Sequence, residues 1–165
     1  MSGENAEHLI SECKQIKDDC EYTAEAHHFI AGYQEIINYV VKLAPAIIAA
    51  WSGIQVLRGA STQIAWLAII SGVVFAVATI LGPERWAAEH TKAAKDYTVL
   101  KHEARSLHEA FYPEMSQSEF YIAVRILREK YNSLVTHTPK TNNMAFKIAQ
   151  KRIREDRHKP DYRES

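Results

Sequence analysis

A run of polar and small side chains interrupts the otherwise apolar stretch from Asn38 to Gly59. Its members follow one another in steps of three and four residues, which places them on a single face of a helix. In a membrane such a face can border a water path, where a lysine disfavours cations and hydroxyl or amide groups keep the constriction wet. Pro45 shares this face, and the pore lining that we predict consists of Asn38, Lys42, Ala49, Ser52 and Gln55.

Two other interpretations of this stripe stay open. Lys42 lies near one end of the apolar stretch, from which its amino group can snorkel to the membrane surface. Ser52 and Gln55 can form hydrogen bonds to a neighbouring helix without any contact with water. The stripe as a set, rather than any one member, favours the pore.

Phosphate-binding chemistry is suggested by a basic C-terminal segment, whose cations are Lys140, Lys147, Lys151, Arg152, Arg154 and Arg157. Lysine and arginine neutralise phosphate charges. Residues 125–165 hold eleven basic and five acidic residues, whereas residues 1–37 hold two basic and eight acidic ones. The alternative is therefore a solvated basic tail that contacts the acidic N-terminal region or anionic lipid headgroups.

Imidazole and aromatic side chains gather on both sides of the apolar region, namely His27, His28, Tyr33, His90 and Tyr97. Such side chains can stack on a nucleobase, although His90 and Tyr97 also suit a packing role. The ligand-binding set that we predict is Lys140, Lys147, Lys151, Arg152, His27, His28 and Tyr97.

No enzyme chemistry is indicated. The sequence has no glycine-rich phosphate loop, nucleophile motif or metal-ligand spacing, so we predict no catalytic residue, metal or cofactor. Cys13 and Cys20 lie about 10 Å apart along one helix face, which disfavours a disulfide, and with His27 they lack the close ligand pairs of a zinc site. We expect two reduced cysteines that act as small apolar residues.

Two apolar runs, Val40–Leu57 and Ile64–Leu81, dominate the middle of the chain. Each has eighteen residues and reaches about 27 Å as a helix, close to the hydrocarbon core of a bilayer at about 30 Å. The alternative is a pair of core helices in a soluble bundle, but the second run has no polar face. Because Gly59 lies in the short segment between the runs, we predict a two-helix transmembrane hairpin.

The second run also carries small residues in steps of three and four. Small side chains let helices approach closely in lipid, so this stripe predicts packing against another helix. Its members are Ala65, Ala68, Gly72, Ala76 and Thr79.

The flanking regions set the expected orientation. Both are long and charged, and the first residues have neither the basic nor the apolar region of a signal peptide. We therefore expect both termini in the cytoplasm and only the short loop on the far side. The domains that we predict are an N-terminal helical arm (1–37), the hairpin (38–82), a second arm (83–112) and C-terminal helices with a basic tail (113–165).

Each arm carries a seven-residue repeat of mostly apolar residues. Steps of four and three alternate without a break, which is the pattern of a coiled-coil seam. The first series is Leu9, Cys13, Ile16, Cys20, Thr23, His27, Ile30, Gln34 and Ile37. The second is Trp86, His90, Ala93, Tyr97, Leu100, Ala104, Leu107 and Phe111. We expect the two arms to be long helices that pack antiparallel through these seams.

Further helices are predicted after the second arm, which Pro113 ends. The stretch Ser116–Glu119 has the form of a capping box and opens a helix with the stripe Phe120, Val124, Leu127, Tyr131 and Leu134. A last basic helix, about Asn142 to Arg157, has Phe146, Ala149 and Ile153 as its apolar face. The predicted fold class is an all-α membrane protein.

The arrangement of two central spans between helical arms resembles the SLATT family. The stretch "AEHTKAAKDYTVL" after the second span is similar to the family pattern through Ala88, His90, Ala94, Tyr97 and Leu100. The resemblance covers roughly residues 20–155 and rests on architecture more than on a tight motif. It implies a prokaryotic inner-membrane effector of an anti-phage or other conflict system. It also implies control by a nucleotide or short oligonucleotide messenger from a partner nucleotidyltransferase.

Two functions are consistent with these features. One is an oligomeric, ligand-gated pore that disrupts the inner membrane. Because a single hairpin cannot enclose water, such a pore needs a homo-oligomer, and a ring of about four first-span helices of roughly 10 Å diameter suits a tetramer. The other is a non-conducting coiled-coil scaffold anchored in the bilayer.

Overall fold

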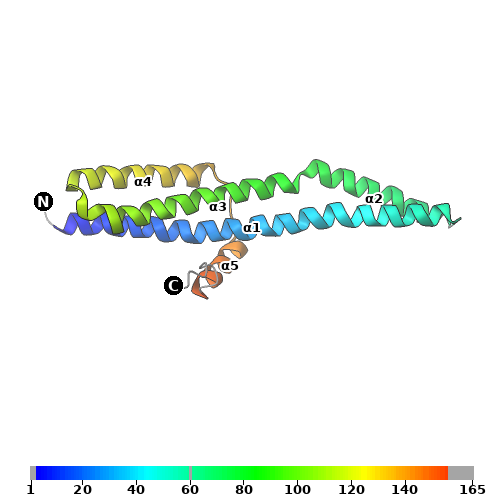
Figure 1. Ribbon diagram of the computed structural model, residues 1–165, viewed down its shortest axis with the longest axis horizontal. Helices are drawn as coiled ribbons and strands as arrows, with labels where there is room; N and C mark the ends of the chain where they lie inside the picture. The colour runs from blue at the N-terminus through cyan, green and yellow to red at the C-terminus, as the bar shows by residue number, and fades with distance from the viewer. Residues whose placement is uncertain (1–2, 60, 156–165) are drawn as a thin grey trace, which may run out of the picture. The chain divides into compact units, whose positions relative to one another are not determined.

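The computed structural model describes residues 3–59 and 61–155, with side chains from residue 6 onward. Within this part every regular element is a helix, as the all-α prediction requires (Figure 1). The α-helices are α1 (Gly3–Leu57), α2 (Thr62–Leu81), α3 (Pro83–Ser106), α4 (Gln117–His137) and α5 (Asn143–Arg154). A π-helical turn (Leu107–Phe111) and a 3₁₀ segment (Tyr112–Glu114) join α3 to α4.

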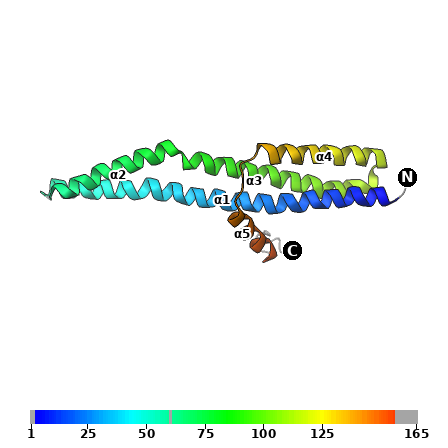
Figure 2. The ribbon, with the colours of Figure 1, turned by 180° about the vertical axis from the view of Figure 1, so that it is seen from behind.

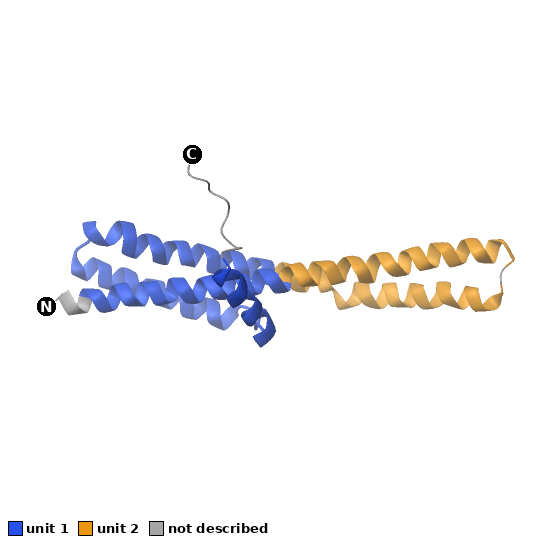
Figure 3. Cartoon of the chain, turned by 90° about the horizontal axis from the view of Figure 1, so that it is seen from below, with its two compact units in different colours: residues 1–30, 89–165 blue, residues 31–88 orange. Residues whose placement is uncertain are grey.

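The chain divides into two compact units (Figure 3). Unit 1 comprises residues 1–30 and 89–165, and unit 2 comprises residues 31–88. Helix α1 contributes its first half to unit 1 and its second half to unit 2. The unit boundaries therefore fall several residues from the predicted domain limits at 37/38 and 82/83.

The core of unit 1 forms where α1, α3 and α4 lie side by side, as both ribbon views show (Figures 1 and 2). The predicted seams supply most of it. Cys13, Ile16 and Cys20 from α1 are completely buried. They pack in one cluster with Tyr97, Leu100, Ala104, Leu107, Phe120, Val124 and Leu127 from the other helices and the π turn.

The second predicted seam is buried from His90 to Leu107 but not at its ends. Trp86 is 59% exposed and Phe111 is 57% exposed. At Phe111 the cause is the π-helical turn that begins at Leu107, because a π turn uses more residues than an α turn and rotates the following side chains off the seam. Tyr112 packs in its place, with its ring centroid 4.6 Å from that of Phe120.

Capping residues fix where the last two helices begin. The Ser116 hydroxyl accepts from the Glu119 backbone N–H and the Glu119 carboxylate accepts from the Ser116 backbone N–H, so the predicted capping box is present. Asn142 caps α5 by accepting from the backbone N–H of Ala145 at 2.7 Å. Helix α5 ends at Arg154, and the predicted end at Arg157 lies outside the described residues.

Helix α5 packs on α1 through alanines. Ala26 of α1 and Ala145 and Ala149 of α5 are all completely buried in one cluster. Two aromatic rings add to this contact, since the ring centroids of Tyr22 and Phe146 lie 6.1 Å apart. The buried face of α5 is thus centred on Ala145 and Ala149, whereas the predicted face member Phe146 is 42% exposed.

Unit 2 contains the second half of α1 and the antiparallel helix α2. The chain reverses after α1 at Gly59, whose φ of 83° lies in the left-handed region that favours glycine. Helix α2 ends at Gly82 with a φ of 60°, and Pro83 opens α3, where a proline costs no hydrogen bond.

Both helices of unit 2 are long and apolar enough to cross a membrane. In each, only 11% of the most apolar eighteen-residue window is buried. A core helix of a soluble bundle is mostly covered by its neighbours, so these helices do not have the burial expected of soluble core helices.

The predicted small stripe of α2 is correct only in its first half. Ala65 and Ala68 are half-buried against α1, but Gly72, Ala76 and Thr79 are exposed. A Cβ atom built on Gly72 meets nothing within 4 Å. The covered positions instead follow a seven-residue repeat in which Ser71 and Ala78 are buried. The prediction chose Gly72, Ala76 and Thr79 for their small side chains alone. The positions that are covered in a packed helix pair depend instead on the seven-residue repeat.

Candidate functional site

The polar stripe of α1 faces α2 within a single chain. Ser52 is completely buried and Pro45 is buried, while Asn38, Lys42, Ala49 and Gln55 are half-buried. The opposite side of the helix is open, with Leu43, Ile47 and Ile54 each more than half exposed. The residues that we predicted to line a pore therefore form one side of a helix–helix contact in the protomer.

Two members of this stripe have polar partners within unit 2. The Lys42 ammonium donates to a Glu84 carboxylate oxygen at 2.8 Å. The Ser52 hydroxyl lies 2.8 Å from the Ile48 carbonyl oxygen and 3.1 Å from that of Ala49, both in its own helix. Such back-bonding satisfies a hydroxyl in an apolar setting without water.

Asn38 differs from these two residues. Its side-chain oxygen Oδ1 is buried and accepts no hydrogen bond from any described residue. An acceptor left unpaired in an apolar environment costs on the order of 1–3 kcal/mol. The amide of Asn38 is therefore a locally unfavourable polar group inside unit 2.

The predicted imidazole and aromatic group is largely a buried cluster in unit 1. His27 Nδ1 lies 2.8 Å from His90 Nδ1. The rings of His27 and Tyr97 are stacked, with centroids 5.7 Å apart. The Tyr97 hydroxyl lies 3.1 Å from the Thr138 hydroxyl at the end of α4, so this cluster joins α1, α3 and α4.

Burial determines the protonation of this cluster. Desolvation, followed by the nearby charges of His90 and His28, lowers the pKa of His27 to about 4. Desolvation also lowers the pKa of His90, against the opposing effect of Glu89. Both imidazoles are therefore neutral near pH 7. His27 and Tyr97 are 1% and 2% exposed, so neither offers a face to a nucleobase, whereas His28 is exposed.

The basic residues of α5 divide into two groups. Arg152 is held against α1, where its guanidinium donates to Glu25 at 2.9 Å and lies 5.4 Å from the Phe29 ring centroid. Lys147, Lys151 and Arg154 of α5 are exposed, as is Lys140, which precedes this helix. The interpretation in which the basic tail contacts the acidic N-terminal region is thus correct for Arg152, and the exposed cations keep the ligand-binding prediction.

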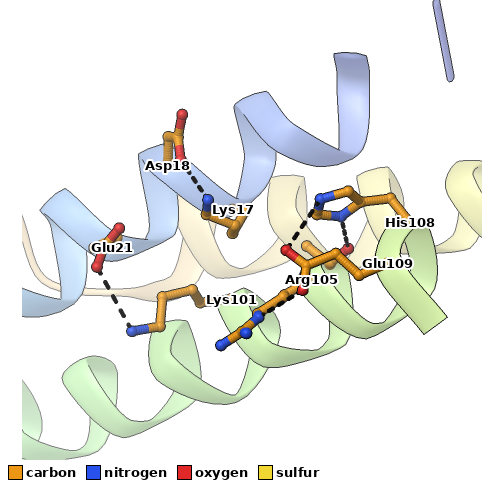
Figure 4. A network of polar contacts seen from close by, with 8 residues as sticks. Lys17, Asp18, Glu21, Lys101, Arg105, His108 and Glu109 are labelled. Carbon is orange, nitrogen blue, oxygen red and sulfur yellow. Dashed lines mark hydrogen bonds and ion pairs between the residues drawn. The ribbon is translucent and has the colours of Figure 1, made fainter. Parts of the chain in front are cut away.

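A polar network between α1 and the α3 side of unit 1 surrounds the buried seam (Figure 4). It includes contacts between Glu21 and Lys101 at 3.9 Å and between Arg105 and Glu109 at 2.8 Å. His108 Nδ1 lies 2.8 Å from the Ala104 carbonyl oxygen. The exposed Arg105–Glu109 pair joins residues four apart in one helical segment, and such a pair contributes roughly 0–1 kcal/mol to stability.

A groove of about 470 Å³ lies in unit 1 between α3 and the end of α4. Sequence reasoning missed its polar residues, because Lys92 and Asp96 of α3 meet His137 of α4 only in the folded unit. Glu89 lines the same groove. Two carboxylates beside one lysine disfavour an anionic ligand, so the groove is a poor site for a phosphate-bearing messenger.

No protein-family model, curated protein or solved structure matches this chain. The class that its fold defines is an all-helical protein with two helices long and apolar enough to cross a membrane.

Proposed function

We propose that this chain is a two-span protein of a prokaryotic inner membrane, with residues 40–57 and 64–81 in the bilayer and both termini in the cytoplasm. The observation that carries the proposal is the exposed apolar surface of the uncharged helix α2. Its exposed large side chains are Trp66, Leu67, Ile69, Ile70, Val73, Val74, Phe75, Val77, Ile80 and Leu81. Covering one such side chain is worth about 1.5–3 kcal/mol, so leaving all of them in water is strongly unfavourable.

The proposed activity is that of a homo-oligomeric, ligand-gated pore that permeabilises the membrane in a conflict system. The polar stripe of α1 gives a physical basis for gating. In the protomer α2 covers this stripe, which suits an effector that must stay closed at rest. Opening requires α1 to exchange contacts with α2 for contacts around a shared axis, with four copies as the favoured number.

Control by a messenger is the other part of this proposal. A nucleotide or short oligonucleotide from a partner nucleotidyltransferase is the expected ligand by resemblance. The exposed cations Lys140, Lys147 and Lys151 are the remaining candidates for its phosphates.

A non-conducting, membrane-anchored scaffold is the second candidate. It is supported by the partners that the stripe already has, namely Glu84 for Lys42 and the helix carbonyls for Ser52. In that case the stripe holds α1 against α2 and never meets water.

Dye release from vesicles separates the two candidates. The purified chain is reconstituted into vesicles loaded with a self-quenching dye, with and without a panel of nucleotides and short oligonucleotides. A pore predicts ligand-dependent release and an oligomeric mass by light scattering in detergent. An integral protein that is monomeric and releases no dye with any ligand contradicts the pore and leaves the scaffold.

A further inference from the structure

A pocket of about 250 Å³ opens in unit 2 where α2 ends and α3 begins. Its walls come from three helices. Ile37 and Val41 belong to α1, Ala78 and Leu81 to α2, and Trp86 to α3. Nothing in the proposed pore or scaffold uses this pocket.

The backbone at Gly82 explains why the pocket exists. Gly82 takes a left-handed conformation with a φ of 60°, and Pro83 then starts a new helix. The path from α2 to α3 therefore bends at this point (Figure 1). Since the bend interrupts the close contact that Ser71 and Ala78 make with α1, α1 and the start of α3 leave a space between them.

The chemistry of the walls selects a hydrocarbon occupant. Among the lining residues only Gln34 has a hydrogen-bonding side-chain amide, and an apolar cavity of this kind stays dry. The volume lies below the roughly 300–1,000 Å³ of sites for drug-sized molecules. A flexible aliphatic chain suits the pocket better than a nucleotide does.

Neighbouring residues place the pocket at the expected membrane boundary. It lies at the end of the uncharged helix α2, beside Trp86 and close in sequence to the ion pair between Lys42 and Glu84. Tryptophan and charged side chains are typical of the headgroup level. An occupant that enters from the bilayer thus has a polar end at the height of these residues.

We propose that this pocket binds one acyl chain of a membrane phospholipid. The inference rests on the membrane insertion proposed above and is independent of whether the protein conducts.

The test counts retained lipids by native mass spectrometry. The full chain is reconstituted into vesicles of equimolar phosphatidylethanolamine and phosphatidylcholine and is then extracted in a mild detergent. We expect one retained phospholipid per chain.

Two pocket-filling variants and one matched control make the test specific. Ala78→Leu and Val41→Phe should each abolish retention, whereas Ala76→Leu, at an exposed position of the same helix, should retain the lipid. Circular dichroism checks that each variant keeps its helix content, so that a misfolded variant is set aside in favour of the other. Folded pocket-filling variants that retain as much lipid as Ala76→Leu overturn the proposal.

Carbonate extraction distinguishes a failure of the pocket proposal from a failure of the proposed function. Membranes that release the wild-type chain at high pH show that it is not integral, and the proposed function then fails first. An integral chain that retains no lipid contradicts only the inference about the pocket.

Discussion

The Nδ1 atoms of His27 and His90 lie 2.8 Å apart in a buried contact between α1 and α3. One ring must donate and the other must accept, so the two imidazoles take opposite tautomers at these nitrogens. If both rings are protonated, two N–H groups and two positive charges face each other. The contact between the two helices therefore depends on at least one neutral imidazole.

The first prediction is a loss of stability in mild acid. The pKa of His27 is about 4 in the folded chain and about 6.5 in an unfolded one, so the unfolded state takes up the proton first. The stabilisation is complete above about pH 6.5 and is lost as the pH falls towards 4. At about 1.36 kcal/mol per pKa unit, the loss is on the order of 3 kcal/mol.

Thermal unfolding of the full chain in detergent, followed by circular dichroism from pH 7.5 to 4.5, measures this effect. His27→Gln should flatten the dependence of the midpoint on pH. His102→Gln, at an exposed position of α3 whose charge is not among those acting on His27, serves as control and should leave it unchanged. Equal pH dependence in wild type and His27→Gln would show that other groups cause the acid sensitivity.

The second prediction concerns the attachment of α5. Arg152→Ala removes an ion pair with Glu25 and a cation–π contact with Phe29, together worth about 1–2 kcal/mol. Faster hydrogen exchange across α5 is the expected result. Lys147→Ala, which changes an exposed lysine of the same helix, should have no such effect. Exchange in α5 that is as slow in Arg152→Ala as in the wild type would contradict the role of Arg152.

The third prediction tests the core of unit 1. Phe120 is completely buried, and Phe120→Ala should cost about 3–5 kcal/mol because the cavity cannot be refilled. Tyr121, the next residue, is 56% exposed, so Tyr121→Ala should change stability by less than about 0.5 kcal/mol. Unfolding midpoints in detergent compare the two variants. Similar losses for both would mean that α4 does not pack through the Phe120 face.

The fourth prediction separates two roles of Lys42. If Lys42 acts through its ion pair with Glu84, Lys42→Glu should destabilise the chain by bringing two carboxylates together, and the exchanged pair Lys42→Glu/Glu84→Lys should restore stability. If Lys42 lines a pore, the single variant should also shift the reversal potential in asymmetric salt towards cation selectivity. Bilayer recording and melting curves on the same preparations distinguish these results.

The packing of unit 1 was predictable from the sequence because it repeats. The series from Cys13 to Cys20 and from His90 to Leu107 alternates steps of four and three, and all of these positions are buried. Thr23, the next member of the first series, is half-buried. The exposure of Phe111 could not be predicted from this repeat. A π turn leaves no periodic signal, since it shifts the pattern once and does not repeat.

The sites were less predictable than the fold because residue type does not reveal the partner. Lys42 fits a pore lining, a snorkelling cation or an ion pair equally well, and only the position of Glu84 distinguishes them in the protomer. His27 and Tyr97 have suitable rings for a nucleobase, yet each stacks on the other. The pocket beside Trp86 depends on a backbone bend at Gly82, and no single side chain in the sequence predicts that bend.

The reactivity of the two cysteines of α1 reports whether unit 1 is folded or opened. Cys13 and Cys20 are unpaired and buried, and burial raises their pKa values to about 11 and 12. Thiolates are the species that alkylating reagents attack, so folded unit 1 resists modification while an opened α1 is modified at once. Pulses of a maleimide therefore time the opening of this helix bundle in intact cells, with no engineered label.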